Sequence, residues 1–206
     1  VTMSKESIRD FCCSISGCSH LEKLELNLMM LHDGVLDLRS LTNLTLFTLG
    51  SVTMSEEYSI SLCSAVSSCT YIESLELKQI TLHCGVLDLR SLTNLTNLKL
   101  REITMSEECS LSLCHSINSC THIESLELKQ ITFYGGVFDL RSLTNLTCLK
   151  LWQVTMSEES IRDFCSSISG CTHLEELELK LMMLHDGVLD LRSLTNLTLF
   201  TLGSVT

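Results

Sequence analysis

Cysteine is the residue type with the widest chemistry in this sequence, since a thiol can bind zinc, form a disulfide or act as a nucleophile. The chain has 12 cysteines in 206 residues. Eight of them form pairs with a C-x5-C spacing, whereas zinc sites commonly contain C-x2-C pairs, and a buried free thiol behaves as a small hydrophobic side chain. We therefore predict reduced core cysteines and a reducing compartment. The pairs are Cys12/Cys18, Cys63/Cys69, Cys114/Cys120 and Cys165/Cys171.

Histidine and asparagine also recur at regular positions. Histidine or tyrosine stands before and after the expected strands, and a position that accepts tyrosine favours packing over metal binding, so we expect no metal site. Four Asn-Leu-Thr sequences match the N-glycosylation signal, but LTNL equally suits the approach to a strand, which is the interpretation we favour. The residues are His20, Tyr71, His122 and His173 before strands, His32, His83, Tyr134 and His185 after them, and Asn43, Asn94, Asn145 and Asn196 in the sequons.

Other patterns that carry chemistry do not occur in the sequence. It has no phosphate-binding glycine loop, no nucleophile elbow and no isolated carboxylate pair, so we expect neither an enzyme nor a cofactor. The net charge of −11 argues against nucleic-acid binding. The longest apolar run, at 28–31 and again at 181–184, is far shorter than the ~18 residues of a membrane helix. The first residues lack an apolar signal segment, so we expect neither membrane insertion nor secretion.

All these residues recur because the whole sequence repeats. Val1-Thr2-Met3-Ser4 returns, with small changes, every 51 residues without insertion or deletion, and residues 205–206 begin a fifth unit. Repeat arrays expose hydrophobic ends unless a polar cap covers them, and no such cap is visible. We therefore expect a piece of a longer protein, which associates end to end when isolated. The four units span 1–51, 52–102, 103–153 and 154–204.

Each unit contains two L-x-x-L-x-L motifs, such as Leu174 to Leu179 and Leu197 to Leu202. Their first leucines are 23 residues apart, and the next unit follows after 28 residues. These motifs and lengths resemble the leucine-rich-repeat superfamily, as eight consecutive repeats over the whole chain. The resemblance implies one α/β domain over residues 1–206. This domain would be a curved, horseshoe-shaped solenoid with a parallel sheet on the concave side and helices and short turns on the convex side.

The 28-residue repeats carry a helical pattern. In residues 157–168 the apolar side chains fall at i, i+3, i+4 and i+7. Thr155 or Ser157 can cap the start of this helix, and Gly170 suits its end. The 23-residue repeats have room only for a short turn of helix, which in the last unit falls around 190–194.

The sequence VTMSEESIRDFCSSISGCTHLEELEL is similar to the helical ribonuclease-inhibitor-like subclass, and most like the repeat arrays of NOD-like receptors. That subclass usually places asparagine or cysteine at the ninth motif position. Here the ninth position is apolar throughout, so no asparagine ladder is expected. The ninth residues are Met29, Val52, Ile80, Ile103, Ile131, Val154, Met182 and Val205.

Function must come from strand residues that point away from the core. Adjacent strands lie ~4.8 Å apart, so equivalent residues of successive repeats form rows. The central row alternates acid and base, which predicts ion pairs between neighbours. A second row is basic with one tryptophan, and a third has acid on alternate strands. The rows are Glu25, Thr48, Glu76, Lys99, Glu127, Lys150, Glu178 and Thr201; Asn27, Gly50, Lys78, Arg101, Lys129, Trp152, Lys180 and Gly203; and Glu22, Thr45, Glu73, Thr96, Glu124, Thr147, Glu175 and Thr198.

The tryptophan in the second row suggests a partner site. An exposed tryptophan among cations is typical of an interface, although Lys129 or Lys180 can equally stack on Trp152 and leave it self-contained. The candidate partner-binding residues are Trp152, Arg101, Lys129, Lys150, Lys99, Lys78, Lys180 and Glu127.

Three functions fit this pattern. The first, which we favour, is recognition of a protein or peptide by the concave face, as the ligand-sensing region of a cytoplasmic NOD-like-receptor-type protein of innate immunity. The second is enzyme inhibition like that of the ribonuclease inhibitors, which are acidic and cysteine-rich; the mixed charge of the rows and the few aromatic residues fit it less well. The third is a structural spacer.

Overall fold

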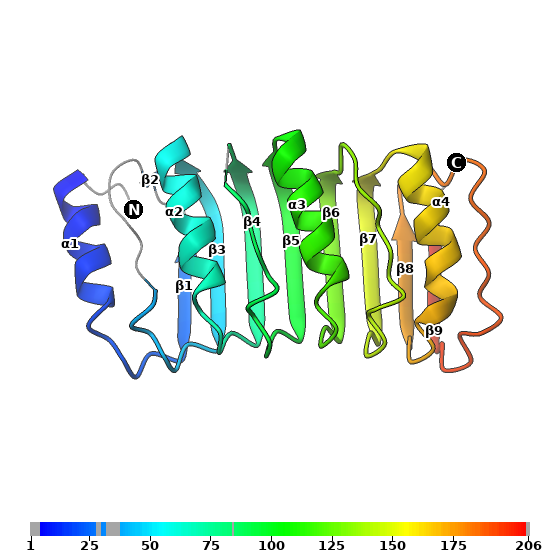
Figure 1. Ribbon diagram of the computed structural model, residues 1–206, viewed down its shortest axis with the longest axis horizontal. Coiled ribbons are helices and arrows are strands. Elements are labelled where there is room, and N and C mark those ends of the chain that lie inside the picture. The colour runs from blue at the N-terminus through cyan, green and yellow to red at the C-terminus, as the bar shows by residue number, and fades with distance from the viewer. Residues whose placement is uncertain (1–4, 28–29, 32–37, 84, 205–206) are drawn as a thin grey trace.

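The computed structural model describes residues 5–27, 30–31, 38–83 and 85–204, and along them two or more strands separate one α-helix from the next (Figure 1). The helices are α1 (Lys5–Ile15), α2 (Glu56–Ser67), α3 (Glu107–Asn118), α4 (Glu158–Ser167) and the 3-10 helix η1 (Ile168–Gly170). The strands are β1 (Lys23–Asn27), β2 (Met30–Leu31), β3 (Leu46–Met54), β4 (Ser74–Leu82), β5 (Asn97–Met105), β6 (Ser125–Thr132), β7 (Cys148–Thr155), β8 (Glu176–Lys180) and β9 (Leu199–Gly203).

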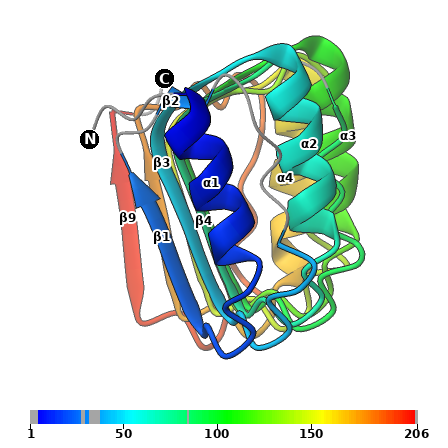
Figure 2. The ribbon, with the colours of Figure 1, turned by 90° about the vertical axis from the view of Figure 1, so that its left-hand side faces the viewer.

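The strands form one parallel sheet in which chain order is also spatial order. The sequence of neighbours is β1-β3-β4-β5-β6-β7-β8-β9, and the short β2 pairs with the far end of β3. Seen from one end, the sheet is one layer and the helices form a second layer on one side of it (Figure 2). The predicted α/β solenoid, with a parallel sheet on one side and helices and turns on the other, is confirmed.

The core lies between these two layers. In β4, Leu75 and Leu77 are 0% and 1% exposed, while Glu76 and Lys78 beside them reach the surface. Burial of each leucine side chain stabilises the folded chain by about 1.5–3 kcal/mol. A shift of the pairing by one residue would turn all these leucines outward, so the leucine pattern fixes the register of the strands. The outward face of the sheet, which the sequence predicts to be concave, is called the strand face below.

A left-handed residue occupies the eighth position of the motif in every repeat for which the structure describes that position. The backbone φ there lies between 51° and 55° in seven repeats, although none of these residues is glycine. Between β4 and β5 the pairing omits this residue, because Lys78 pairs with Arg101 and the next pair joins Ile80 and Ile103. The kink turns the ninth residue into the core, and Ile80 is 2% exposed. The left-handed residues are Ser51, Gln79, Glu102, Gln130, Gln153, Leu181 and Ser204.

The helix starts follow the sequence prediction, and one helix end does not. The hydroxyls of Ser55, Ser106 and Ser157 each accept a backbone N–H at the first turn of their helices. Helix α4 ends at Ser167, with Ile168 as its C-terminal cap, and continues as η1 up to Gly170. Gly170 is therefore not the helix cap that we predicted, because the last turn tightens into a 3-10 helix before the glycine.

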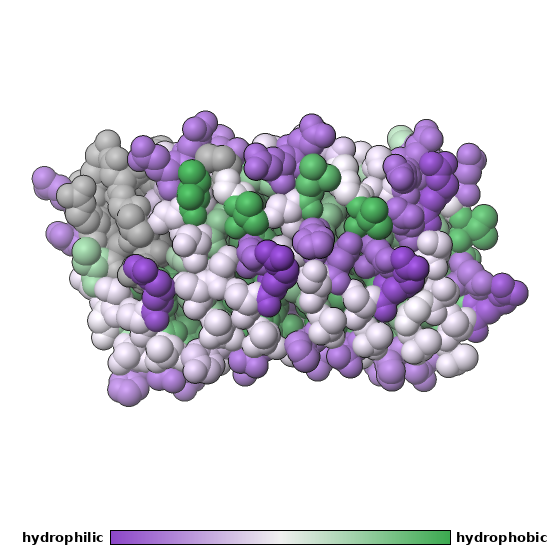
Figure 3. All heavy atoms as spheres, in the orientation of Figure 1, coloured by the Kyte–Doolittle hydropathy of each residue, from purple (hydrophilic) through white to green (hydrophobic). Residues whose placement is uncertain are grey.

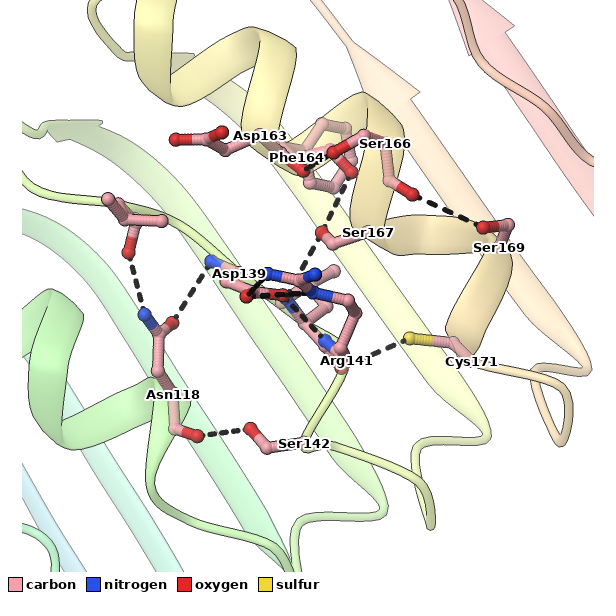
Figure 4. Close-up of polar contacts among 12 residues, drawn as sticks. Asn118, Asp139, Arg141, Ser142, Asp163, Phe164, Ser166, Ser167, Ser169 and Cys171 are labelled. Carbon is pink, nitrogen blue, oxygen red and sulfur yellow. Dashed lines mark hydrogen bonds and ion pairs between the residues drawn. The ribbon is translucent and has the colours of Figure 1, made fainter.

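The short helical turn predicted in the 23-residue repeats is also wrong. Residues 190–194 form turns without a helix. The carboxylate of Asp139, like that of Asp190, accepts the backbone N–H two residues on, from Arg141 at 3.0 Å, and pairs with its guanidinium. This local bond fixes a turn in place of a helix. Figure 4 shows how Asn118, Ser167 and Cys171 of the flanking repeats also bind this segment.

Candidate functional site on the strand face

The strand face brings the predicted rows together in the predicted order. Glu76, Lys99, Glu127, Lys150 and Glu178 are neighbours on successive strands, and we call them the central row. Lys78, Arg101, Lys129, Trp152 and Lys180 are likewise neighbours, and we call them the basic row.

Arg101 joins these two rows. Its Nε and Nη2 donate to the two carboxylate oxygens of Glu127 at 2.7 and 3.0 Å, and its Nη1 donates to Glu76 at 3.2 Å. Glu127 is 8% exposed. The bond to Glu127 is also the largest cause of the raised pKa of the Arg101 guanidinium. A two-bond pair of this kind holds both side chains in one geometry.

Lys150 and Lys180 form a second ionic cluster around Glu178, which is 7% exposed. Lys150 Nζ lies 3.1 Å from Glu178 and 2.8 Å from Glu176, and Lys180 also pairs with Glu178. Its hydrogen bond to Lys180 is the main reason why the pKa of Glu178 is lowered. The bond to Glu176 is the main reason why the pKa of Lys150 is raised.

These contacts correct one prediction. We expected the central row to pair acid with base between adjacent strands, but within that row only Lys150 and Glu178 do so among the described residues. Arg101 of the basic row binds Glu76 and Glu127 diagonally. The guanidinium presents its donors as a fork, so it contacts carboxylates on two different strands at once.

Trp152 lies between two lysines. Lys129 Nζ of β6 lies 5.4 Å and Lys180 Nζ of β8 lies 4.8 Å from the ring centroid. Trp152 is half-buried, and its Nε1 is buried without a hydrogen-bond partner in the described part of the chain. These contacts are those of the stacked arrangement, in which tryptophan and lysines stabilise one another, while a partner contact at Trp152 stays a prediction.

Three lysines of the central and basic rows make no ion pair with the described residues. Within the described ranges, Lys78, Lys99 and Lys129 have no carboxylate oxygen within 4.0 Å. All three are half-buried, so their stems lie along the sheet while their ammonium groups remain available. They are the cations of these two rows that a ligand meets without first breaking an ion pair between described residues.

The strand face also contains a fourth row, which the sequence analysis did not identify. Its members precede the central row by two residues and therefore share its face. Cys148 donates to Glu176 across 3.1 Å, and burial raises the pKa of its thiol to about 11. Asn97 has a buried Oδ1 without a partner in the described residues. Strand alternation would have found the row, which consists of Lys23, Leu46, Ser74, Asn97, Ser125, Cys148, Glu176 and Leu199.

The predicted core cysteines are mostly buried. Cys63, Cys69, Cys109, Cys114, Cys120, Cys165 and Cys171 are buried, whereas Cys13 and Cys18 are exposed. Cys12 and Cys84 lie outside the described side chains. Burial raises the pKa of Cys114 to about 12 and those of Cys120 and Cys171 to about 11, so these thiols stay protonated at neutral pH.

The recurrent asparagines form hydrogen bonds to the backbone, and so does one of the recurrent histidines. The Nδ2 atoms of Asn43, Asn94, Asn145 and Asn196 each donate to a backbone carbonyl of the preceding repeat, at 2.8–3.2 Å. His173 Nδ1 lies 2.9 Å from the Thr144 carbonyl. No group of three histidine, cysteine or carboxylate side chains is placed to hold a metal among the residues the structure describes. No described helix is long and apolar enough to cross a membrane.

The helix side of the molecule presents a different surface. Figure 3 shows apolar side chains gathered over α2, α3 and the loops that follow β4 and β6. They include Ile60, Val86, Leu111 and Val137, which are 43–50% exposed. The position of Ile60 and Leu111 is taken by arginine in the outer units, so the helix part of this patch belongs to the two middle units, whereas Val188 of the last unit is exposed like Val86 and Val137.

Comparison with known proteins identifies the fold. No protein-family model and no curated protein sequence matches the chain. Among solved structures, an internalin (inlF) from Listeria monocytogenes is similar, with a TM-score of 0.59 and 22% identity over 93% of this chain and 50% of the internalin. The plant peptide hormone receptor RGFR1, solved in complex with RGF2, has a TM-score of 0.55 and 14% identity over 100% of this chain and 34% of the receptor.

The chain thus spans half or less of the length of both neighbours. At these identities the likeness bears on the fold alone, and it does not extend to the ribonuclease-inhibitor-like or NOD-like subclass suggested by the sequence. Together with the eight stacked parallel strands, it shows that this chain has the fold of a leucine-rich-repeat solenoid.

Proposed function

We propose that this chain is a binding module that recognises a protein or peptide through the strand face. The observation that carries the proposal is the set of three lysines, Lys78, Lys99 and Lys129, that form no ion pair with the described residues, although their neighbours in the central and basic rows do. A sheet of stacked repeats positions such groups rigidly, which limits the entropy lost on binding. The solved neighbour RGFR1 is a peptide hormone receptor, which agrees with this role.

The finer assignment, a ligand-sensing region of a cytoplasmic NOD-like-receptor-type protein, is also a proposal. Its support is the resemblance in sequence and the number of buried thiols with raised pKa values, which suit a reducing compartment. The cytoplasmic assignment is tested by asking whether the four Asn-Leu-Thr sequons carry glycans in protein isolated from its native source. Unmodified asparagines and free Cys13 and Cys18 are expected, whereas glycans on these sites would place the chain outside the cell.

Selection from a random peptide library tests the strand face itself. Peptides selected against the chain are measured against Lys99→Glu on the strand face and Leu111→Lys on α3. Neither substitution removes an ion pair of the described residues; each replaces one surface side chain, and Lys99→Glu changes the net charge by −2 while Leu111→Lys changes it by +1. We expect Lys99→Glu to weaken binding and Leu111→Lys to leave it unchanged. Binders that respond only to Leu111→Lys would move the site to the apolar patch of the helix side.

A further inference from the structure

The charge on the strand face is divided between its two borders. Glu73, Glu124 and Glu175 lie exposed just before their strands, on the border called the acidic edge. The basic row lies five residues further along each strand, about 16 Å away. Between them, Arg101 and Lys150 neutralise the buried carboxylates of the central row. Although the chain has a net charge of −11, a ligand that approaches the basic row meets positive charge.

The lysines of the basic row have a regular spacing. Lys78, Lys129 and Lys180 lie on β4, β6 and β8, which are alternate strands of the sheet. Two strand spacings are about 9.6 Å. Arg101, on the strand between the first two, is already held by Glu127 and Glu76. Trp152, on the strand between the last two, contacts both of its lysine neighbours and fixes their stems.

This spacing selects among peptide conformations. A polyproline II helix has three residues per turn and rises about 3.1 Å per residue, so every third residue faces the same side at about 9.3 Å. In a β-strand the same side returns after two residues, at about 6.8 Å, which does not match alternate strands of the sheet. An α-helix needs an apolar groove, whereas the middle of the strand face is polar or charged apart from Trp152 and Cys148.

We propose that the basic row binds an acidic peptide in the polyproline II conformation, which runs across the strands with a carboxylate at every third residue facing Lys78, Lys129 and Lys180. The peptide avoids the acidic edge and keeps Trp152 against its backbone between two carboxylates. This inference rests on the proposed function, because it uses the same strand face. It adds the chemistry of the partner and the direction in which the partner lies.

Fluorescence anisotropy with labelled peptides of equal composition tests the spacing. The first peptide is Glu-Pro-Ala repeated four times, and the second contains the same residues with its glutamates clustered at the two ends. At low salt we expect the first to bind about tenfold more tightly, since three spaced contacts are lost together in the second. Lys78→Gln and Lys129→Gln should each lower the affinity for the first peptide about threefold. High salt should lower the affinity of every variant for it.

Lys23→Gln is the matched control, because Lys23 is exposed on β1 outside the basic row. Circular dichroism confirms that each variant is folded. Equal affinity for the two peptides, or affinity that Lys78→Gln and Lys129→Gln leave unchanged, would overturn the inference. Neither acidic peptide binding, while Lys99→Glu still weakens the binding of peptides from the random library, would reject the acidic polyproline II peptide and leave the proposed function in place. If the library peptides also ignore Lys99→Glu, both fall.

Discussion

Lys180 Nζ lies 4.8 Å from the centroid of the Trp152 ring, one strand away, and at the same time pairs with Glu178. The ammonium of Lys129, on the other neighbouring strand, lies 5.4 Å from the same centroid. The indole thus sits in a positively charged setting within a strongly acidic chain. The tryptophan side chain therefore positions two lysines of the basic row through its contacts with them.

The setting of Trp152 predicts unequal quenching of its fluorescence. Trp152 is the only tryptophan, so its emission reports this site alone. Iodide should quench it more strongly than caesium, because the two ammonium groups attract the anion and repel the cation. The double variant Lys129→Gln/Lys180→Gln should reduce the difference between the two quenchers. Equal quenching of the unsubstituted chain by both ions would contradict the stacked arrangement.

Arg101 is expected to matter more for stability than the other cations of its surroundings. Arg101→Gln leaves Glu127, which is 8% exposed, without its two-bond partner, and should lower the free energy of unfolding by about 1–3 kcal/mol. Lys99→Gln is the control, since Lys99 forms no ion pair within the described residues, and should change it by less than about 0.5 kcal/mol. Urea denaturation measures both values. Adding Glu127→Gln should recover part of the loss, and a control as damaging as Arg101→Gln would refute this account.

The buried thiols predict a loss of stability at alkaline pH. Burial raises the pKa of Cys114 from 9.0 to about 12 and those of Cys120 and Cys171 to about 11. Above pH 9 the unfolded chain loses these thiol protons while the folded chain keeps them. The stabilisation is therefore complete below pH 9 and falls as the pH rises towards 11–12.

Thermal denaturation at pH 7.5 and pH 10 under reducing conditions checks this expectation. The difference between the two melting temperatures should be smaller in Cys114→Ala than in the unsubstituted chain. Cys13→Ala serves as the control, because Cys13 is exposed. An equal difference in all three proteins would assign the alkaline loss to other groups.

The parts of the fold that depend on periodicity could be predicted from the sequence. The leucine spacing predicted the stacked strands, so Lys129 and Trp152 were placed side by side without a structure. The hydroxyl cap at Ser157 and the burial of Ile80 also follow from local pattern. In each case one repeated physical requirement, such as burial or capping, selects the residue type in every unit.

The remaining features depend on choices that the residue type leaves open. The left-handed position holds serine, glutamine, glutamate and leucine, so no residue type marks it. Rotamers decide that Arg101 binds Glu76 and Glu127 diagonally, while register alone suggested pairing within the central row. The turn at Asp139 replaces a helical turn through one side-chain bond, which competes with the helix on nearly equal terms.

The last strand predicts end-to-end association of the 206-residue chain when it is produced alone. Phe200 and Leu202 of β9 are 42% and 52% exposed, whereas Phe47 and Leu49, at the same positions of β3, are fully buried beneath β4. The sequence LFTLG is identical in both strands, so a β1 strand of a second copy can pair with β9 as β4 pairs with β3. This contact is head-to-tail and does not close, so it continues from copy to copy.

Light scattering should show an average mass that rises with concentration, and Phe200→Lys/Leu202→Lys should give a monomer, because the charges would be buried in the contact. The exposed Leu111→Lys on α3 is the control and should leave association unchanged. A monodisperse monomer of the unsubstituted chain at high concentration would show that the open edge of β9 does not accept a second copy.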